Sequence, residues 1–289
     1  MKYRFIYIIL FAFIIQAGIL KAQIKNTIRF ENYKREYILY LPKNLPPDAP
    51  LVFVFHGYTG TAAGTMKSFG LNKVADKNGF AVCYPQGLKD QQGKTFWQVG
   101  YSFHKKLKVD DLKFICFLAS TLQAKYHVSK SNTFITGISN GGDLCNLLIC
   151  KTTGLFKAAA LIVGCIMKDI YDSCSNAAPV PLLMLNGTKD SITHWAGDMK
   201  DLQGYGPYLP TEMMLDFRIA QNGVTLSKTD TLFSQKPKDD SYIVKAKYSN
   251  KDSKNQVLMY RVINGGHDYP PYINMAEEIW RFFSDYVNQ

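Results

Sequence analysis

The chain has 289 residues, of which 47% are hydrophobic, and a formal net charge of +11. The length suits one large α/β domain better than two small ones, and the apolar content is ample for a buried core. No block of Lys and Arg is interleaved with aromatic residues, so we expect no nucleic-acid partner. The charge indicates a basic soluble surface, or an affinity for anionic polysaccharide or an anionic cell surface.

The first 22 residues have the pattern of a secretory signal. Two basic residues precede an apolar run that extends to Leu20, and Ala22 is a small residue at the expected cleavage point. The sequence therefore predicts a signal peptide over residues 1–22 and a single domain over residues 23–289, secreted or periplasmic and without stable membrane insertion after cleavage. An uncleaved anchor is the alternative, although the run is a little short for a spanning helix.

The elements that follow alternate between strands and helices. Two antiparallel strands are expected between Asn26 and Leu41, with a turn near Asn32–Tyr33. Short apolar runs then predict buried strands at residues 51–55, 80–84, 133–136, 158–163, 182–185 and 257–262. Helical patterns lie at residues 70–77, 110–126, 141–150, 211–222 and 273–287. This alternation predicts an α/β fold with a mostly parallel central sheet and helices on both faces. Residues 225–255 are polar and partly alternating, which indicates a hairpin inserted before the last strand.

Six cysteines are present, and none has a C-x-x-C partner, so we expect no zinc site. They are Cys83, Cys116, Cys145, Cys150, Cys165 and Cys174. An even number in an exported chain permits disulfides, but the 15 possible pairings stay open. Cys174 lies in a polar loop and is the favoured bridged cysteine, whereas Cys83 lies in an apolar strand and is expected to be a core thiol.

A glycine-flanked serine follows the third buried run. Gly137-Ile-Ser139-Asn140-Gly141 stands between a β-branched strand and an apolar helical pattern. In this strand–turn–helix setting the G-x-S-x-G pattern is typical of a nucleophile elbow, because glycines at both flanks allow the sharp turn that exposes the hydroxyl. We predict Ser139 as a nucleophile, which needs an adjacent base because a serine hydroxyl reacts poorly at neutral pH.

Asp190 is the predicted acid. It follows the buried run 182–185 through a turn that contains Gly187, which allows the carboxylate to face back toward the elbow. A carboxylate there would fix the tautomer of a histidine and stabilise its cation. An ordinary turn aspartate is the alternative. The competing acids are Asp169, Asp198 and Asp201.

His267 is the predicted base. Of five histidines, it alone follows the last buried strand and precedes the C-terminal helix. It would accept the proton of the serine and return it to the leaving alcohol. A surface-loop histidine is the alternative. His194 is too close to Asp190 in sequence to be favoured, and exposed structural positions are expected for His104 and His127.

The segment His56-Gly57-Tyr58 follows the first buried strand. Backbone N–H groups of such a loop, with the N–H after the nucleophile, form the oxyanion hole of elbow enzymes. Tyr58 and Asn140 are therefore the predicted donors, through their main chains. An ordinary glycine turn is the alternative, and His56 is expected to hold the loop.

Asp110 and Asp111 open a predicted helix, where capping and the helix dipole explain paired carboxylates better than acid–base chemistry or a metal. Four loop aromatic residues could stack on a sugar or an aromatic acyl group, or could pack internally. They are Trp97, Tyr101, Trp195 and Tyr205. We predict Trp97 and Trp195 as substrate-binding residues.

Four segments resemble the esterase/polyhydroxybutyrate depolymerase family, which overlaps the feruloyl and acetylxylan esterases of carbohydrate esterase family one. They are His56-Gly57, Gly137-Ile-Ser-Asn-Gly-Gly142, Asn186-Gly-Thr-Lys-Asp190 and Asn264-Gly-Gly-His267. The resemblance extends from about Arg35 to the C-terminus. It implies an α/β-hydrolase fold, no metal or other cofactor, and ester cleavage with Ser139 as nucleophile, Asp190 as acid and His267 as base. One departure is Tyr58, where many members carry a cysteine.

We therefore predict a serine carboxylic-ester hydrolase with an acyl-serine intermediate, whose substrate is a small ester, a polysaccharide-linked ester or a polyester. The polymer-degrading members of the family often carry linker and binding domains that this sequence does not show. Small esters, or acyl groups on plant polysaccharide, are therefore at least as well supported as insoluble polyester. The alternatives are a serine peptidase of the prolyl oligopeptidase type, which shares the triad order, and a non-catalytic surface- or carbohydrate-binding protein on a hydrolase scaffold.

Overall fold

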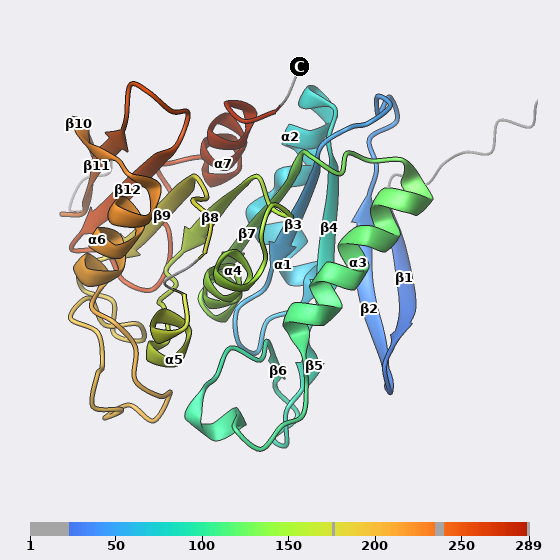
Figure 1. Cartoon of the computed structure of the whole chain (residues 1–289), viewed down its shortest axis with the longest axis horizontal. Coiled ribbons are helices and arrows are strands. Elements are labelled where there is room, and N and C mark those ends of the chain that lie inside the picture. The colour runs from blue at the N-terminus through green and yellow to red at the C-terminus, as the bar shows by residue number, and fades with distance from the viewer. Residues whose placement is uncertain (1–22, 175–176, 235–239, 288–289) are drawn as a thin grey trace, which may run out of the picture.

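The computed structural model describes residues 23–174, 177–234 and 240–287, and the predicted signal peptide lies outside these ranges. Its centre is a ten-stranded sheet with the order β1-β2-β4-β3-β7-β8-β9-β12-β11-β10 (Figure 1). These strands are β1 (Gln23–Phe30), β2 (Tyr33–Tyr40), β3 (Leu51–Phe55), β4 (Ala81–Gln86), β7 (Thr133–Ile138), β8 (Ala158–Ile162), β9 (Leu182–Gly187), β10 (Thr225–Phe233), β11 (Tyr242–Ser249) and β12 (Gln256–Ile263). Two short strands, β5 (Leu88–Lys89) and β6 (Thr95–Phe96), pair with each other in a separate hairpin.

The middle of the sheet is parallel and its two sides are antiparallel. Parallel pairings join β4, β3, β7, β8, β9 and β12. The β1–β2 hairpin is joined antiparallel to β4, and the β10–β11 hairpin is joined antiparallel to β12. The predicted mostly parallel sheet is confirmed, as are the entry hairpin and the hairpin within residues 225–255. That second hairpin extends the main sheet rather than standing apart from it.

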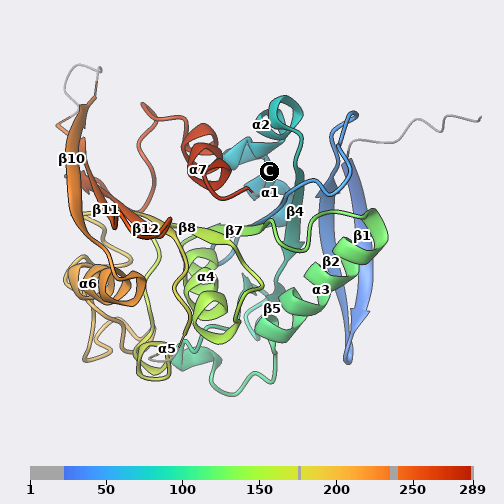
Figure 2. The same ribbon diagram turned by 45° about the horizontal axis from the view of Figure 1, so that its top comes forward.

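Helices cover both faces of the sheet (Figure 2). One face carries α1 (Ala62–Phe69), α2 (Leu71–Asn78) and α7 (Met275–Ser284). The other carries α3 (Asp111–Tyr126), α4 (Asn140–Lys151), α5 (Lys168–Asp172) and α6 (Thr211–Asn222). The sequence did not predict α1 and α5, because helices of eight and five residues are too short to show a clear helical pattern. The start of α1 is fixed instead by Thr61, whose hydroxyl accepts a hydrogen bond from the Gly64 amide at 3.0 Å.

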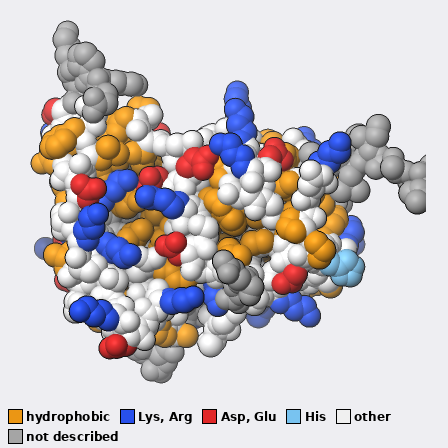
Figure 3. Space-filling view, turned by 90° about the horizontal axis from the view of Figure 1, so that it is seen from above, with side chains coloured by type: hydrophobic (Ala, Val, Ile, Leu, Met, Phe, Trp, Pro, Cys, Tyr) orange, Lys and Arg blue, Asp and Glu red, His pale blue; other side chains and the backbone are white. Residues whose placement is uncertain are grey.

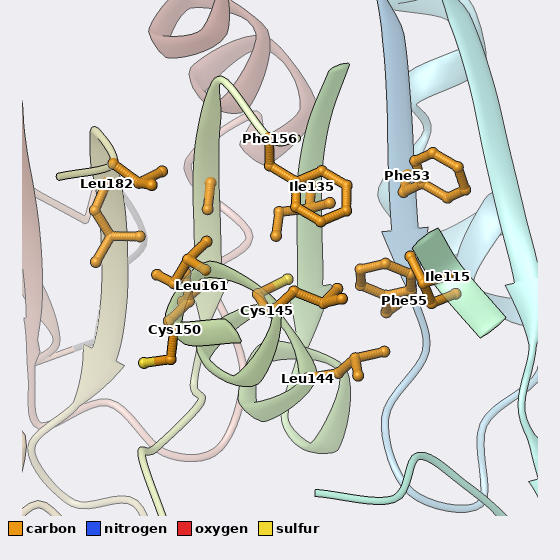
Figure 4. Packing of buried hydrophobic residues seen from close by; sticks show 14 of the residues in the cluster. Phe53, Phe55, Ile115, Ile135, Leu144, Cys145, Cys150, Phe156, Leu161 and Leu182 are labelled. Carbon is orange, nitrogen blue, oxygen red and sulfur yellow. The ribbon is translucent and has the colours of Figure 1, made fainter. Parts of the chain in front are cut away.

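Alternate residues of each buried strand enter different cores, because side chains point to opposite faces of a sheet. Phe53 and Phe55 of β3 lie in one cluster with side chains of α3 and α4 (Figure 4). Val52 and Val54 lie in the other cluster with side chains of α1, α2 and α7. All four have no exposed surface. This two-sided burial holds the parallel strands in place, and therefore also the loops at their carboxyl ends.

The two carboxylates at the start of α3, Asp110 and Asp111, have different structural roles. Asp110 is the N-cap, since its side chain accepts a hydrogen bond from the Lys113 amide at 2.9 Å. Asp111 is buried and forms an ion pair with Arg35 at 2.6 Å. The predicted capping role is thus confirmed for Asp110, while Asp111 joins the helix to β2.

Cys174 is bonded to Cys150, with 24 residues of sequence separation. Both sulfur atoms lie beside the guanidinium of Arg218, which is fully buried and also donates to Asn146 Oδ1 at 2.7 Å. Burial lowers the pKa of Arg218 to about 9. Cys83 is a buried free thiol, as predicted.

The two edge strands are β1 and β10. Along β10, every residue except Leu232 is exposed, and Lys228 and Asp230 place charges on it. The pairing of β10 with β11 is irregular between Leu226 and Lys228.

On the face shown in Figure 3, Lys and Arg side chains are mixed with acidic and apolar ones instead of forming a continuous stripe. None of the helices in the described part of the chain combines the length and apolar character that a bilayer span requires.

Candidate active site

Ser139 stands at the turn between β7 and α4, in the middle of the parallel sheet. Its φ is 55°, a conformation that residues with a side chain rarely adopt and that often marks a functional turn. A Cβ on Gly137 would lie 2.4 Å from the backbone of Gly141, and a Cβ on Gly141 would lie 2.5 Å from the carbonyl oxygen of Phe55. The two glycines are therefore required because the turn leaves no space for a side chain at either position.

Two loops bring a histidine and a carboxylate to this turn. His267 Nε2 lies 2.8 Å from Ser139 Oγ, and His267 Nδ1 lies 2.7 Å from Asp190 Oδ2. Because an ionised carboxylate only accepts hydrogen bonds, we assign the proton to Nδ1, which leaves Nε2 to accept from the serine hydroxyl. The side chain of Asp190 is 1% exposed and that of His267 is 21% exposed. The carboxylate is thus shielded from water, while the imidazole reaches the surface of the site.

The carboxylate of Asp190 is fixed from both sides. Its Oδ1 accepts hydrogen bonds of 2.8 Å from the amides of Ile192 and Thr193. Two of the competing acids, Asp198 and Asp201, instead accept hydrogen bonds from amides of their own loop. Among the three, Asp190 is the one that reaches His267.

The loops of Asp190 and His267 contact each other because β9 and β12 are parallel neighbours. The Lys189 amide donates to the Gly265 carbonyl at 2.9 Å, and the Asn264 amide donates to the Thr188 hydroxyl at 2.9 Å. A Cβ on Gly187 would lie 2.3 Å from the carbonyl oxygen of Gly266. The Asn-Gly-Thr-Lys-Asp and Asn-Gly-Gly-His segments therefore pack closely, and this packing sets the distance between the carboxylate and the imidazole.

Ser139 and His267 line a pocket of about 280 Å³. Its wall is mainly aromatic and apolar and includes Tyr58, Tyr101, Ile138, Cys165, Met167, Ile192, Tyr205 and Tyr208. This volume is near the lower limit of ligand pockets, about 300 Å³, and suits a small group. Two other hollows, of about 320 and 880 Å³, are not lined by Ser139 or by any histidine.

The backbone amides of Tyr58 and Asn140 are free to donate. Among the residues that the structure describes, neither N–H has a hydrogen-bond acceptor. The next amide, that of Thr59, does have one, the Thr95 carbonyl at 2.8 Å. Tyr58 lines the pocket, and Asn140 directly follows Ser139. Two unpaired amides beside a nucleophile suit an oxyanion, which would accept a hydrogen bond from each.

The two tryptophans that were predicted to bind substrate lie outside the pocket wall. For Trp97 the prediction is wrong in this structure, because the indole has no exposed surface and donates to the His56 carbonyl at 2.9 Å. Trp195 is half-buried against the core, so its contact with substrate stays a prediction. Of the four loop aromatic residues considered, Tyr101 and Tyr205 line the pocket.

Asp143, in the first turn of α4, is a pocket residue that the sequence did not reveal. It is buried and accepts hydrogen bonds from the Tyr101 hydroxyl at 2.6 Å and from the Cys165 amide at 2.7 Å. Burial raises its pKa to about 6, although these two hydrogen bonds act in the opposite direction. An acidic residue at the start of a helix is usual, so its position gave no signal of this role.

His56 holds the loop as predicted. It has no exposed surface, its Nε2 accepts from the Gly87 amide at 2.9 Å, and its Nδ1 lies 2.7 Å from the Gly57 carbonyl. Burial lowers its pKa to about 4, which keeps the ring neutral.

The expectation of an exposed His104 is wrong. Its side chain is 2% exposed, because the rings of Phe96, Tyr101 and Phe103 surround it. Its Nε2 lies 3.2 Å from Asp90 Oδ2. His127 is exposed, as expected.

A protein-family model described as esterase PHB depolymerase matches residues 35–228. Feruloyl esterase B of Piromyces equi is 26% identical over 172 residues, which cover 58% of this chain and 31% of that protein. Acetylxylan esterase A of Talaromyces purpureogenus is 28% identical over 142 residues, which cover 48% of this chain and 36% of that protein. The chain thus spans about a third of the length of these relatives.

Among solved structures, the acetyl xylan esterase from Aspergillus awamori is similar, with a TM-score of 0.66 and 17% sequence identity. The superposition covers 92% of this chain and 100% of that one. At this identity the likeness concerns the fold alone. The predicted α/β-hydrolase fold is confirmed.

Proposed function

Because the chain belongs to the PHB depolymerase esterase family, we propose that it is a serine carboxylic-ester hydrolase that works through an acyl-serine intermediate. The observation that carries the proposal is the hydrogen-bonded series from Ser139 Oγ through His267 to Asp190, with distances of 2.8 and 2.7 Å. A serine hydroxyl, an imidazole and a shielded carboxylate in this order are the parts that acyl transfer requires.

In the proposed reaction, Ser139 Oγ attacks the ester carbonyl carbon while His267 Nε2 accepts the hydroxyl proton. The carbonyl oxygen becomes an oxyanion that accepts hydrogen bonds from the amides of Tyr58 and Asn140. When the carbon–oxygen bond to the alcohol breaks, His267 returns the proton to the leaving oxygen. Water then attacks the acyl-serine by the same route, and Asp190 keeps Nδ1 protonated and stabilises the imidazolium throughout.

We propose that the substrate is an ester with a small acyl group. It is a small ester, an ester linked to a polysaccharide, or a polyester. The pocket of about 280 Å³ supports a small acyl group, and the names of the relatives support polysaccharide-linked esters. Turnover of acetylated xylan, methyl ferulate and hydroxybutyrate oligomers by the purified protein would rank these classes. Faster turnover of a proline amide than of any ester would favour a peptidase instead.

The decisive variants are Ser139→Ala and His267→Ala, assayed with p-nitrophenyl acetate. Each should lower kcat/KM at least about a thousand-fold, and the double variant should be no slower than either single variant, because such residues act as a unit. Ser120→Ala, on the exposed side of α3, is the control and should match the wild type. A fluorophosphonate probe should label the wild type and not Ser139→Ala. Near wild-type activity in Ser139→Ala would contradict the proposal.

We further propose that the protein acts outside the cytoplasm after removal of residues 1–22. The basic and apolar pattern of these residues supports this location. The mature protein, recovered from periplasm or medium, should begin at Gln23. An N-terminus still at Met1 would contradict it.

A further inference from the structure

The β5–β6 hairpin and its flanking residues (87–98, called the 87–98 hairpin below) contact both backbone segments that carry an unpaired amide. On the Tyr58 side, the Tyr58 hydroxyl donates to Asp90 Oδ2 at 2.6 Å. The Thr59 amide donates to the Thr95 carbonyl at 2.8 Å, and the Thr95 hydroxyl donates to the Gly60 carbonyl at 2.5 Å. Residues 58–60 are thus fastened to the hairpin at three points, while the N–H of Tyr58 is left free.

On the Asn140 side the contact is reciprocal. The Trp97 amide donates to Asn140 Oδ1 at 2.7 Å, and Asn140 Nδ2 donates to the Trp97 carbonyl at 3.1 Å. The Trp97 indole also holds the His56 carbonyl. Trp97, Asn140 and His56 have no exposed surface, so water does not compete for these bonds. One residue of the hairpin therefore fixes both the residue after Ser139 and the start of the opposite loop.

Asp90 joins the turn of the hairpin to Tyr58. Its Oδ1 accepts hydrogen bonds of 2.9 Å from the amides of Gln92 and Lys94, and its Oδ2 accepts from the Tyr58 hydroxyl and faces His104. Its side chain is 4% exposed. Hydrogen bonds to an ionised acceptor are stronger than neutral ones, and this carboxylate has little access to water. The two hydrogen bonds that stabilise the turn use only Oδ1. The hydrogen bond between Oδ2 and the Tyr58 hydroxyl therefore has another role.

We propose that the 87–98 hairpin positions both oxyanion donors, and that Asp90 is the positioning residue for Tyr58. The inference rests on the proposed function, since an oxyanion forms here only if an ester is attacked. Asp90 touches no reacting atom and acts through the Tyr58 ring and backbone. A displaced Tyr58 amide would leave substrate binding largely unchanged but would stabilise the transition state less, because a donor must lie about 2.7–3.1 Å from the oxyanion.

Tyr58→Phe is the cleanest test, since it removes the hydroxyl that reaches Asp90 and keeps the ring and the backbone. Asp90→Asn is the second variant. The matched control is Tyr40→Phe, which removes a tyrosine–aspartate hydrogen bond of 2.7 Å, to Asp76, away from the pocket. For each protein we would measure kcat and KM with p-nitrophenyl acetate. We would also measure the inhibition constant of a trifluoromethyl ketone, whose adduct with the nucleophile places an oxyanion in the hole.

Loss of a whole oxyanion donor costs about 100- to 1,000-fold in kcat. A donor that stays in place but is held less firmly should lower kcat by a smaller factor. We therefore expect Tyr58→Phe and Asp90→Asn each to lower kcat about ten-fold. The inhibition constant should rise by a similar factor and KM should stay within about two-fold. The double variant should be no slower than the slower single variant, because both changes act on the Tyr58–Asp90 hydrogen bond, and Tyr40→Phe should match the wild type.

An unchanged kcat in Tyr58→Phe would overturn the inference, as would an equal loss in Tyr40→Phe or a loss that appears only in KM. Each of these results would leave the proposed function standing, provided that Ser139→Ala is inactive. An active Ser139→Ala would overturn both.

Discussion

Acid should destabilise this protein through His56. The ring is fully buried, and its Nε2 accepts a hydrogen bond from the Gly87 amide at 2.9 Å. A proton on Nε2 would turn this acceptor into a donor that faces another donor. Burial is the main cause that lowers the pKa of His56 to about 4, while the Gly57 carbonyl raises it and the charge of Arg35 lowers it further.

The size and sign of the effect follow from this pKa. In the unfolded chain His56 has its ordinary pKa of 6.5, so between pH 6.5 and about 4 the unfolded state binds a proton that the folded state does not. The stabilisation is complete above pH 6.5 and is lost as the pH falls toward 4. The difference between the two pKa values corresponds to about 3 kcal/mol of unfolding free energy.

Urea unfolding of the wild type and of His56→Gln, followed by tryptophan fluorescence between pH 7 and pH 4, would measure this effect. Glutamine does not titrate, so the stability advantage of the wild type should shrink by about 3 kcal/mol over this range. The raised pKa of Asp143 acts in the opposite direction between pH 4 and 6, but both proteins share it and it cancels in the difference. If the difference in unfolding free energy between the two proteins stayed constant within about 1 kcal/mol from pH 7 to pH 4, the reasoning would be refuted.

Three further changes test the packing around the site. Gly141→Ala should lower the unfolding free energy by more than about 2 kcal/mol, because the added Cβ would lie 2.5 Å from a carbonyl oxygen. Gly266→Ala should change it by less than about 0.5 kcal/mol, because a Cβ there would have no heavy atom within 4 Å. Equal thermal midpoints for this pair would contradict the geometry. Replacing Cys150 and Cys174 by serine should cost about 3 kcal/mol in urea unfolding, as the 24-residue separation implies, and an unchanged midpoint would argue against this. Arg218→Ala should cost about 3 kcal/mol or more, since it leaves a cavity and removes the donor to Asn146 Oδ1, and a calorimetric loss below about 1 kcal/mol would disagree.

The parts of the candidate site that the sequence revealed are those set by local geometry and chain order. Ser139 could be identified because a strand, two glycines and a helix are adjacent in sequence. Asp190 and His267 could be nominated because each follows a buried strand, and the carboxyl ends of neighbouring parallel strands lie at one edge of the sheet. The structure brings these three side chains together, in the order that was expected.

The parts that the sequence did not reveal depend on how distant loops fold back. Trp97 was predicted to contact substrate, with internal packing as the alternative, and it has no exposed surface because the segment that carries it folds inward. Asp90 is indistinguishable from an ordinary turn aspartate until the Tyr58 hydroxyl is seen to reach it. His104 was misplaced for the same reason, since the rings around it, among them those of Tyr58 and Phe96, come from separate segments of the chain. No periodicity within one segment reports such contacts.

The exposed outer strand β10 has a consequence for how copies of this protein meet. An unpaired strand edge is a template on which a second molecule can add its own strand and begin a growing aggregate. Here Lys228 and Asp230 interrupt that template, and the irregular pairing after Leu226 keeps the edge from being straight. A second copy would have to align charged side chains along a bent edge. This strand should therefore disfavour edge-to-edge association of two copies through β10, even in concentrated solution.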